Sequence, residues 1–444
     1  MHTINKLYIW LVILLGITGC KQNDLPGHNP GAPIVIDRFI PEEGQGGTEM
    51  MIFGRNFSGD TTGVVVTVNG ARATVTGINH ERILLTVPEG AGTGLVEVQI
   101  GNQKGSSTVP FRFPPVFQWR VTTLAGSGQA GYADGTGSAA QFRFDRAPGL
   151  AVDAEGNVYV ADAGNHCIRK ITPQGEVSTF AGTGVAGYAD GGADQAQFDT
   201  PFDVAVDQDN NVFVADTWNA KLRKITPEGT VSTVTGVGDI VGIAIDPRNN
   251  QVLVSSLTNG AIYRVEDSGN LTTVLQGLGW VSGLAINEEG ILFVVETGKS
   301  VIHRLDLKSV VDGPGVSTII AGMPGQTGWE DGPGASAKFD RPWGIAVSPV
   351  TGMLFVAGDA GPYGGPWYDD GGNNTNQCIR QINPRGWEVS TFAGAPERGY
   401  ADGSLDEARF NNPTGVAVGP YGSIYVVDAN NHSIRKIVRE EVYE

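Results

Sequence analysis

Residues 158–162 read Val-Tyr-Val-Ala-Asp, and residues 165–170 read Asn-His-Cys-Ile-Arg-Lys. The first run is apolar and rich in β-branched side chains, and polar residues separate it from the second, which is the pattern of two short strands joined by a turn. Similar pairs of runs recur downstream, for example at 211–215 with 221–225 and at 423–427 with 433–437. A repeat made of short strands and turns predicts a series of small antiparallel sheets.

Each pair of runs belongs to a larger repeat that contains four apolar segments. A Val-Ser/Thr-Thr pattern, with Leu for Val in one copy, begins at residues 121, 177, 231, 271, 316 and 389, so the mean spacing is (389 − 121)/5, about 54 residues. Four short strands in this length are typical of the blades of a β-propeller. The repeats resemble NHL repeats over residues 121–439, and six copies imply six blades.

The two ends of the repeat region predict how the ring closes. The region opens with a lone outer strand at 121–125 and stops after a third strand at 433–437. Pairing these strands completes the last blade and removes an exposed sheet edge. We therefore predict an all-β fold in which residues 119–439 form a six-bladed propeller with three-plus-one strand closure. Cys167 and Cys378 occupy equivalent positions in blades one and five and are expected to be buried thiols.

Residues 33–113 carry short alternating runs separated by turn residues, such as Asn69-Gly70, and predict a small β-sandwich. Gly46-Gly47-Thr48 and the Phe-Gly-Arg-Asn-Phe sequence at 53–57 resemble the IPT/TIG immunoglobulin-like domains. The resemblance implies a fold and leaves the ligand open. A spacer is the expected role of this domain.

The N-terminus predicts an exported, lipid-anchored protein. Lys6 precedes an apolar run that is too short to span a bilayer, and the run ends in Ile17-Thr18-Gly19-Cys20. This ending resembles a bacterial lipobox, so residues 1–19 are expected to be the signal peptide, Cys20 the acylated residue and residues 20–32 a tether. An ordinary signal peptide with an incidental cysteine is the alternative. The resemblance implies the outer membrane, with the cell surface favoured over the periplasmic face.

Composition excludes several classes of partner. The 444 residues include 30 Lys and Arg against 47 Asp and Glu, a net charge of −17. This balance argues against binding to nucleic acid and to anionic lipid surfaces, so the lipid anchor is the only expected contact with the membrane. Three cysteines without a CxxC pair cannot form a disulfide framework.

Departures from the repeat point to a binding surface. Strands alternate in direction, so the second-to-third turns and the crossovers between blades open on one face, which we name the top face. Aromatic residues gather there, and large flat side chains beside polar groups suit sugar rings. A plug for the channel, or packing beneath the insertion at 361–374, is the alternative role. The predicted ligand-binding residues are the platforms Trp218, Trp280, Trp343, Trp367 and Tyr368, with Asp203, Arg146 and Arg341 as hydrogen-bonding partners.

Other recurring residues are expected to be structural. The crossovers repeat a Gly-aromatic-x-Asp-Gly pattern, and its aromatics, such as Tyr132, are expected to pack between blades. Asp162 and Asn165 are expected to cap their own turn through backbone hydrogen bonds. His166 and His432 are expected to be hydrogen-bonded surface histidines.

No catalytic, metal or cofactor site is predicted. Six-bladed propellers include metal-dependent lactonases and lyases, but at the starts of the inner strands Asp203 is the single hard metal ligand. No catalytic serine, zinc or Cys–His motif is evident. Asp369, Asp370, Asn373 and Asn374 offer oxygen ligands for Ca²⁺, although their spacing is not that of an EF-hand.

The order of signal, tether, immunoglobulin-like domain and propeller resembles accessory surface lipoproteins of bacterial polysaccharide-utilisation systems. The resemblance implies a non-catalytic protein that binds a polysaccharide or oligosaccharide near an outer-membrane importer. Two alternatives remain. The first is a protein-interaction scaffold for an outer-membrane transporter, and the second is a propeller lyase or lactonase.

Overall fold

The computed structural model describes residues 28–311, 313–358 and 377–442. The chain divides into two compact units, residues 1–118 with 441–444 and residues 119–440. Within the described ranges, no helix has the length and apolar character needed to cross a membrane. The predicted signal peptide, Cys20, Trp367, Tyr368 and the Asp/Asn group at 369–374 lie outside the described residues.

The first unit is the predicted β-sandwich. Side chains alternate between buried and solvent-facing along its strands, as in Glu49–Arg55, and the buried ones form one core that includes Phe39, Met50 and Phe111. One sheet has the order β1 (Val35–Ile40), β2 (Glu49–Arg55), β6 (Arg82–Thr86) and β5 (Thr74–Asn79). The other has the order β4 (Ala71–Arg72), β3 (Val64–Val68), β7 (Gly94–Ile100) and β8 (Gln103–Phe111).

The second unit is a β-propeller, whose described residues form six sheets that we number blades 1 to 6 in chain order. Blade 1 contains β10 (Gly135–Thr136), β14 (Glu176–Ala181), β13 (Cys167–Ile171), β12 (Val158–Asp162) and β11 (Leu150–Val152). Blade 2 contains β15 (Pro201–Val206), β16 (Val212–Asp216), β17 (Lys221–Ile225) and β18 (Val231–Gly236). Blade 3 contains β19 (Ile240–Asp246), β20 (Gln251–Ser256), β21 (Ala261–Val265) and β22 (Leu271–Leu275).

Blades 4 to 6 follow the same antiparallel order. Blade 4 contains β23 (Val281–Ile286), β24 (Ile291–Glu296), β25 (Val301–Asp306) and β26 (Thr318–Ala321). Blade 5 contains β27 (Gly332–Pro333), β31 (Glu388–Gly394), β30 (Cys378–Ile382), β29 (Leu354–Gly358) and β28 (Pro342–Val347). Blade 6 contains β32 (Gly403–Ser404), β9 (Val116–Ala125), β35 (Ser433–Val442), β34 (Ile424–Asp428) and β33 (Pro413–Val418).

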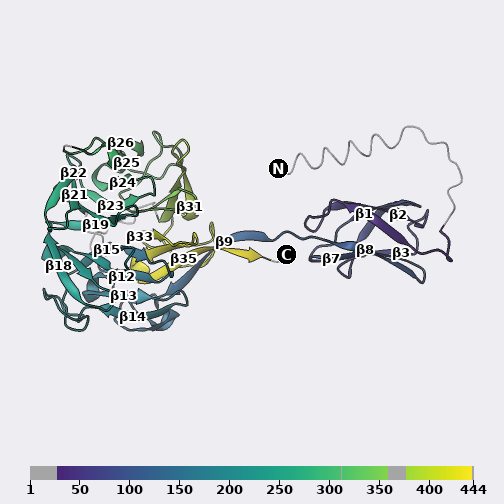
Figure 1. Ribbon diagram of the computed structural model, residues 1–444, viewed down its shortest axis with the longest axis horizontal. Helices are drawn as coiled ribbons and strands as arrows, with labels where there is room; N and C mark the ends of the chain where they lie inside the picture. Colours follow the sequence, from purple (N-terminus) through teal and green to yellow (C-terminus); the bar gives the residue numbers. More distant parts are fainter. Residues whose placement is uncertain (1–27, 312, 359–376, 443–444) are drawn as a thin grey trace. The chain divides into compact units, whose positions relative to one another are not determined.

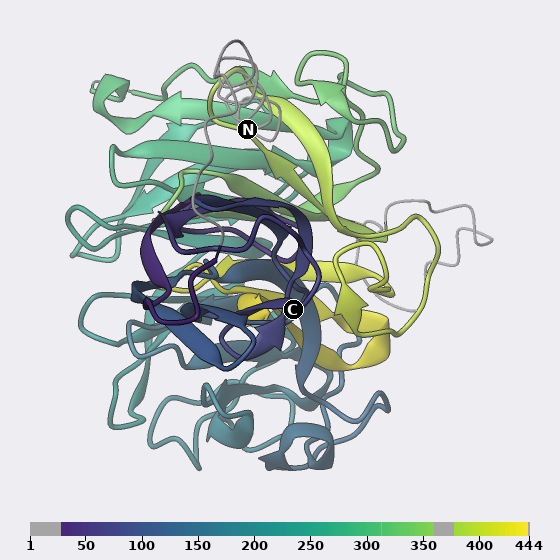
Figure 2. The same ribbon diagram turned by 90° about the vertical axis from the view of Figure 1, so that its right-hand side faces the viewer.

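The blades form a ring. Their innermost strands contact one another in the order β11, β15, β19, β23, β28, β33 and back to β11. Figure 1 shows the blades following one another from blue through green to yellow, and Figure 2 shows the yellow last blade beside the blue first one. Strand β9 lies beside β35 in blade 6, so the first strand of the propeller completes the last blade, as the three-plus-one closure requires.

The core of the propeller lies between neighbouring blades. Each large apolar cluster draws its side chains from two adjacent blades, as where Tyr159 and Ile168 of blade 1 pack with Val214 and Ile225 of blade 2. Similar clusters join the other neighbouring pairs, including blades 6 and 1. Cys167 and Cys378 are buried within this arrangement, as predicted.

Glycines let the inner strands approach the axis closely. A Cβ on Gly344 would lie 2.4 Å from the backbone oxygen of Thr414, and one on Gly283 would lie 2.5 Å from that of Trp343. Such distances are too short for real side chains, so glycine is required where one inner strand meets the next. The equivalent position in blade 2 carries Asp203, which therefore stands out structurally as well as in sequence.

Candidate functional site

The axis of the propeller contains a small cavity. Its volume is about 60 Å³, and its lining comes from the inner strands of all six blades, including Asp203 and Trp343. By the same measure one water molecule needs about 10–15 Å³, so the cavity has room for a few water molecules.

Asp203 links three blades at this cavity. Its Oδ2 accepts the backbone N–H of Ile243 in blade 3 at 2.9 Å, and its Oδ1 occupies the space that a Cβ on Gly149 of blade 1 would need. Burial raises the pKa of Asp203 to about 7, against the opposing effect of hydrogen bonds from the Ile243 and Val204 amides. Within the described part of the chain, no group of three or more His, Cys, Asp or Glu side chains is arranged to hold a metal ion.

Trp343 differs from the exposed platform that we predicted. It is only 4% exposed and belongs to an apolar cluster with Ala147, Phe202, Val241 and Leu257. The reason is its place on the inner strand β28, which directs the indole to the cavity rather than to the surface. This geometry fits the alternative role of filling the channel.

Trp218 is an exposed aromatic residue on the top face. It is the middle residue of the 3-10 turn η3 (Thr217–Asn219), and 59% of its surface is exposed. The hydrogen bonds that hold the turn include those from the Trp218 N–H to the Asp199 carbonyl at 3.2 Å and from the Thr217 hydroxyl to the Ile240 carbonyl at 2.6 Å. The middle residue of the corresponding turn is Gly164 in blade 1 and Gly298 in blade 4, so the fold does not require an indole here.

Arg146 lies against Trp218. The Cζ atom of its guanidinium is 5.2 Å from the centroid of the indole ring, which is cation–π distance. Arg146 comes from the crossover of blade 1 and Trp218 from a turn of blade 2, so two of the predicted site residues meet across a blade boundary.

A two-residue insertion brings Arg146 to this position. In blade 1, Gly149 at the start of the inner strand comes 149 − 142 = 7 residues after the crossover phenylalanine Phe142. In blade 2, the equivalent Asp203 comes only 203 − 198 = 5 residues after Phe198. Arg143 N–H bonds to Asp162 Oδ1 as Asp199 N–H bonds to Asp216 Oδ1. Phe144 N–H likewise bonds to His432 as Thr200 N–H bonds to His166. The two additional residues therefore lie within 145–148, the stretch that contains Arg146, and a count along the repeats could have found this insertion.

The other described site residues lie apart from this pair. Trp280 is 43% exposed in the crossover before β23, where its carbonyl accepts the Gly298 N–H at 3.2 Å. Arg341 donates its backbone N–H to the Ser300 hydroxyl, and its Nε is 3.3 Å from Asp340 Oδ1. Among the described residues, no ring or charge contact joins Trp280 or Arg341 to Trp218.

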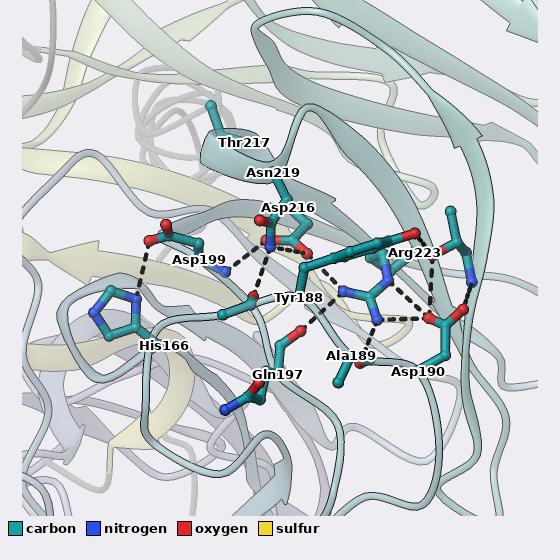
Figure 3. Close-up of polar contacts among 12 residues, drawn as sticks. His166, Tyr188, Ala189, Asp190, Gln197, Asp199, Asp216, Thr217, Asn219 and Arg223 are labelled. Atoms are coloured by element: carbon teal, nitrogen blue, oxygen red, sulfur yellow. Dashed lines mark hydrogen bonds and ion pairs between the residues drawn. The ribbon is translucent and has the colours of Figure 1, made fainter.

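The recurring motifs form buried arginine clusters, shown for blade 2 in Figure 3. The fully buried Arg223 bonds to Asp216 Oδ2 at 2.7 Å and to Asp190 Oδ1 at 2.6 Å. The rings of Tyr188 and Phe198 lie 5.0 and 5.1 Å from its guanidinium carbon. Arg169 in blade 1 and Arg435 in blade 6 have equivalent partners. The crossover tyrosines are therefore structural, as predicted, but they pack against the arginine of the blade that they enter rather than between blades.

The role predicted for Asp162 was wrong. Its side chain does not cap the following turn; it accepts hydrogen bonds from Arg143 N–H and Asn165 and pairs with Arg169 at 2.8 Å. Because a buried carboxylate needs a charged partner, the long-range pair takes precedence over a local cap. Burial nevertheless raises the pKa of Asp162 to about 6, against the opposing influence of Arg169. His166 is partly buried and accepts the Thr200 N–H of the next blade at 3.1 Å.

Blade 4 replaces this arginine cluster. The buried Glu296 pairs with His303 Nε2 and with Lys299 Nζ, each at 2.8 Å, and accepts the Gly279 N–H. His303 Nδ1 lies 3.0 Å from the Ser317 hydroxyl. Burial raises the pKa of Glu296, but the hydrogen bonds from His303, Lys299 and Gly279 together outweigh burial and lower it to about 2. This pair was not singled out in the sequence, where its Glu and His replace the Asp and Arg of other blades.

Comparison with known families agrees with the two units. An IPT/TIG domain matches residues 34–113, and the NHL repeat matches residues 144–171 and 410–437. The chain is therefore a protein with a TIG domain followed by an NHL-repeat β-propeller.

The individual proteins that resemble this chain differ from it considerably in sequence. NHL repeat-containing protein 2 of Homo sapiens is 28% identical over 349 residues, with 71% of this chain and 43% of that protein covered. The chain thus spans less than half the length of this curated relative. Two crystal structures of auxiliary nutrient binding proteins share the fold. The one from Bacteroides thetaiotaomicron has a TM-score of 0.59 at 22% identity, and the one from Bacteroides ovatus has 0.60 at 21%. Each comparison covers 94% of this chain and all of the other.

Proposed function

We propose that this protein is a non-catalytic nutrient-binding protein that captures a glycan on the top face of its propeller. The observation that carries the proposal is the exposed Trp218 with Arg146 stacked against it. Both residues are additions to the repeat rather than parts of it, so the fold alone does not explain why they meet. Trp280, also exposed on the top face, is a second platform in the proposal.

The chemistry of the pair suits a sugar. A sugar ring has an apolar C–H face that can cover an indole and hydroxyl groups that accept hydrogen bonds from a guanidinium. Covering exposed apolar surface contributes about 25 cal/mol per Å², so a platform the size of an indole is a substantial source of affinity. The proposed site is on the surface, where Trp218 is exposed.

The solved relatives support the nutrient-binding part of the proposal by analogy. They share the whole two-unit architecture and are described as auxiliary nutrient binding proteins. Fold alone does not define a ligand, so the glycan rests on the aromatic site. We further propose that Cys20 carries a lipid, that the protein is held at the outer membrane facing the cell surface, and that it acts beside a polysaccharide importer.

Calorimetric titration of the full chain against a panel of neutral and acidic polysaccharides tests the proposal. We expect saturable binding that Trp218→Ala weakens at least tenfold. Tyr421→Ala is the matched control, because Tyr421 is 88% exposed and lies on the β33–β34 turn of the opposite face. If no polysaccharide in the panel gives a heat of binding, or if both variants lose affinity equally, the glycan site is contradicted and the scaffold alternative is favoured.

The lipid anchor has its own test. In cells fed an alkyne-labelled fatty acid, the wild-type chain should carry the label and fractionate with membranes. Cys20→Ala should lose both properties, while Cys167→Ala, which alters a buried thiol, should keep them. A labelled Cys20→Ala protein would refute lipidation at this residue.

A further inference from the structure

The two arginines in the crossover of blade 1 differ in their partners. Arg143 pairs with Asp145 at 2.8 Å. Arg146, in contrast, makes no ion pair with any described residue, and its guanidinium lies over the indole of Trp218. In a chain with 47 acidic against 30 basic residues, Arg146 therefore lacks, within the described ranges, the carboxylate partner that Arg143 has.

Other cation–aromatic contacts in the propeller belong to the repeat. Lys170 lies over Tyr159 in blade 1 and Lys436 over Tyr425 in blade 6, and both aromatic rings are buried. The pair of Arg146 and Trp218 has no such counterpart, because it depends on the insertion in blade 1 and on the residue in the middle of η3. A guanidinium beside an exposed indole is placed at a surface where a ligand can reach both groups.

The chemistry of arginine narrows the class of ligand. Its planar guanidinium offers several N–H donors in a fork that matches the oxygens of a carboxylate or sulfate group. Contact with Trp218 restricts the side chain before a ligand arrives, so less conformational entropy is lost on binding.

We infer that the glycan is acidic and that Arg146 binds its carboxylate or sulfate group while a neighbouring sugar ring stacks on Trp218. The inference rests on the glycan site proposed above and specifies its substrate class. The net charge of −17 does not oppose such binding at contact distance, because ionic screening has a range of about 8 Å at physiological salt. The selectivity for acidic over neutral glycans is a short-range effect of the ion pair between Arg146 and the acidic group of the ligand.

The test compares charged and neutral forms of the same polymers. The full chain is titrated calorimetrically with oligogalacturonate and its methyl ester, and with dextran sulfate and dextran. We expect one acidic form to bind more tightly than its neutral counterpart, and the responding pair identifies the group as carboxylate or sulfate. Arg146→Gln should lower the affinity for that acidic form about tenfold, which corresponds to about 1.4 kcal/mol, and should lower the affinity for the neutral form by a clearly smaller factor.

Two controls make the result specific. Arg385→Gln removes an exposed arginine from the β30–β31 turn on the opposite face and should change nothing. Raising the salt concentration should weaken acidic but not neutral binding in the wild type, a result that does not depend on any variant.

Three results would overturn the inference. Equal binding of acidic and neutral forms, unaffected by Arg146→Gln, would refute the acidic class and leave the glycan site intact. Acidic selectivity that survives Arg146→Gln would refute the role of this arginine. Absence of binding to every polymer, neutral ones included, would refute the glycan site itself.

Discussion

Blades 2 and 4 place different side chains at the same two positions. In both blades a carboxylate ends the second strand, and the residue seven positions later on the third strand pairs with it. Blade 2 uses Asp216 and Arg223, and blade 4 uses Glu296 and His303. Arg223 reaches on to Asp190 and packs between Tyr188 and Phe198, whereas His303 ends at the Ser317 hydroxyl.

The length of the crossover explains the difference. The crossover into blade 2, between β14 and β15, is long enough to supply an aromatic residue and a second carboxylate to the arginine. The crossover into blade 4 contains only residues 276–280. A guanidinium there would be buried without four of the five hydrogen bonds that Arg223 makes, those to Asp190, Ala189 and Gln197, which is costly. The recurring Tyr and Asp residues are thus structural, and residues outside the repeat, such as Arg146 and Trp218, are the ones to examine for function.

The largest expected effect comes from breaking the buried pair in blade 2. Asp216→Ala should lower the free energy of unfolding of the propeller by about 3–5 kcal/mol, because it leaves the Arg223 charge buried without its inner partner. Asp190→Ala removes the outer carboxylate, whose side chain is 45% exposed, and should cost about 1 kcal/mol or less. Denaturant titration measures both. Equal losses would show that the two carboxylates are equivalent and would contradict the account.

Blade 4 should respond to acid. The pKa of Glu296 is lowered from its ordinary 4.5 to about 2 in the folded protein. Its stabilisation is therefore complete above pH 4.5 and is lost as the pH falls towards 2. Glu296→Gln should be about 3 kcal/mol less stable than the wild type at pH 7, and the difference should shrink as the pH falls from 4.5 to 2. A difference that stays constant over this range in pH-dependent unfolding would contradict the assignment.

Replacing Asp203, on the innermost strand of blade 2, should have a smaller effect on stability, and its pH dependence should have the opposite sign to that of Glu296. Its folded pKa is raised from 3.8 to about 7, so its favourable contribution is present below pH 3.8 and is lost as the pH rises through 7. Asp203→Asn keeps an oxygen to accept the Ile243 N–H and should be about 2 kcal/mol more stable than the wild type at pH 8, after allowing for water in the channel. The gain should vanish at pH 4. A gain independent of pH would show that the carboxyl charge is irrelevant.

The fold could be predicted from sequence because the repeat is internal. Six copies of the same four segments show where strands begin and end, and the lone strand at 121–125 indicates the closure that β9 makes. The buried state of Cys167 and the packing role of Tyr132 follow from the same periodicity.

The site could be predicted only in part. Trp218 stands out in the sequence because its turn is polar or glycine-rich in other blades, and the structure exposes it. Trp343 looks similar in sequence but is buried, because one position along an inner strand decides between the cavity and the surface. The contact of Arg146 with Trp218 depends on how far one crossover reaches across a blade boundary, and Asp162 pairs across seven residues instead of capping its turn. The positions and partners of these side chains depend on tertiary packing and burial, and local sequence patterns carry no information about either.

The most direct test of the account measures binding and stability together in two variants of blade 2. Trp218 and Tyr188 are both aromatic and more than half exposed, at 59% and 52%, but one lies outside the repeat and the other within it. Trp218→Ala should weaken polysaccharide binding at least tenfold in calorimetry and leave the unfolding midpoint within about 1 °C. Tyr188→Ala should keep the affinity and lower the stability by about 1 kcal/mol through the lost contact with Arg223. Polysaccharide binding that survives Trp218→Ala but is lost in Tyr188→Ala would contradict the central claim.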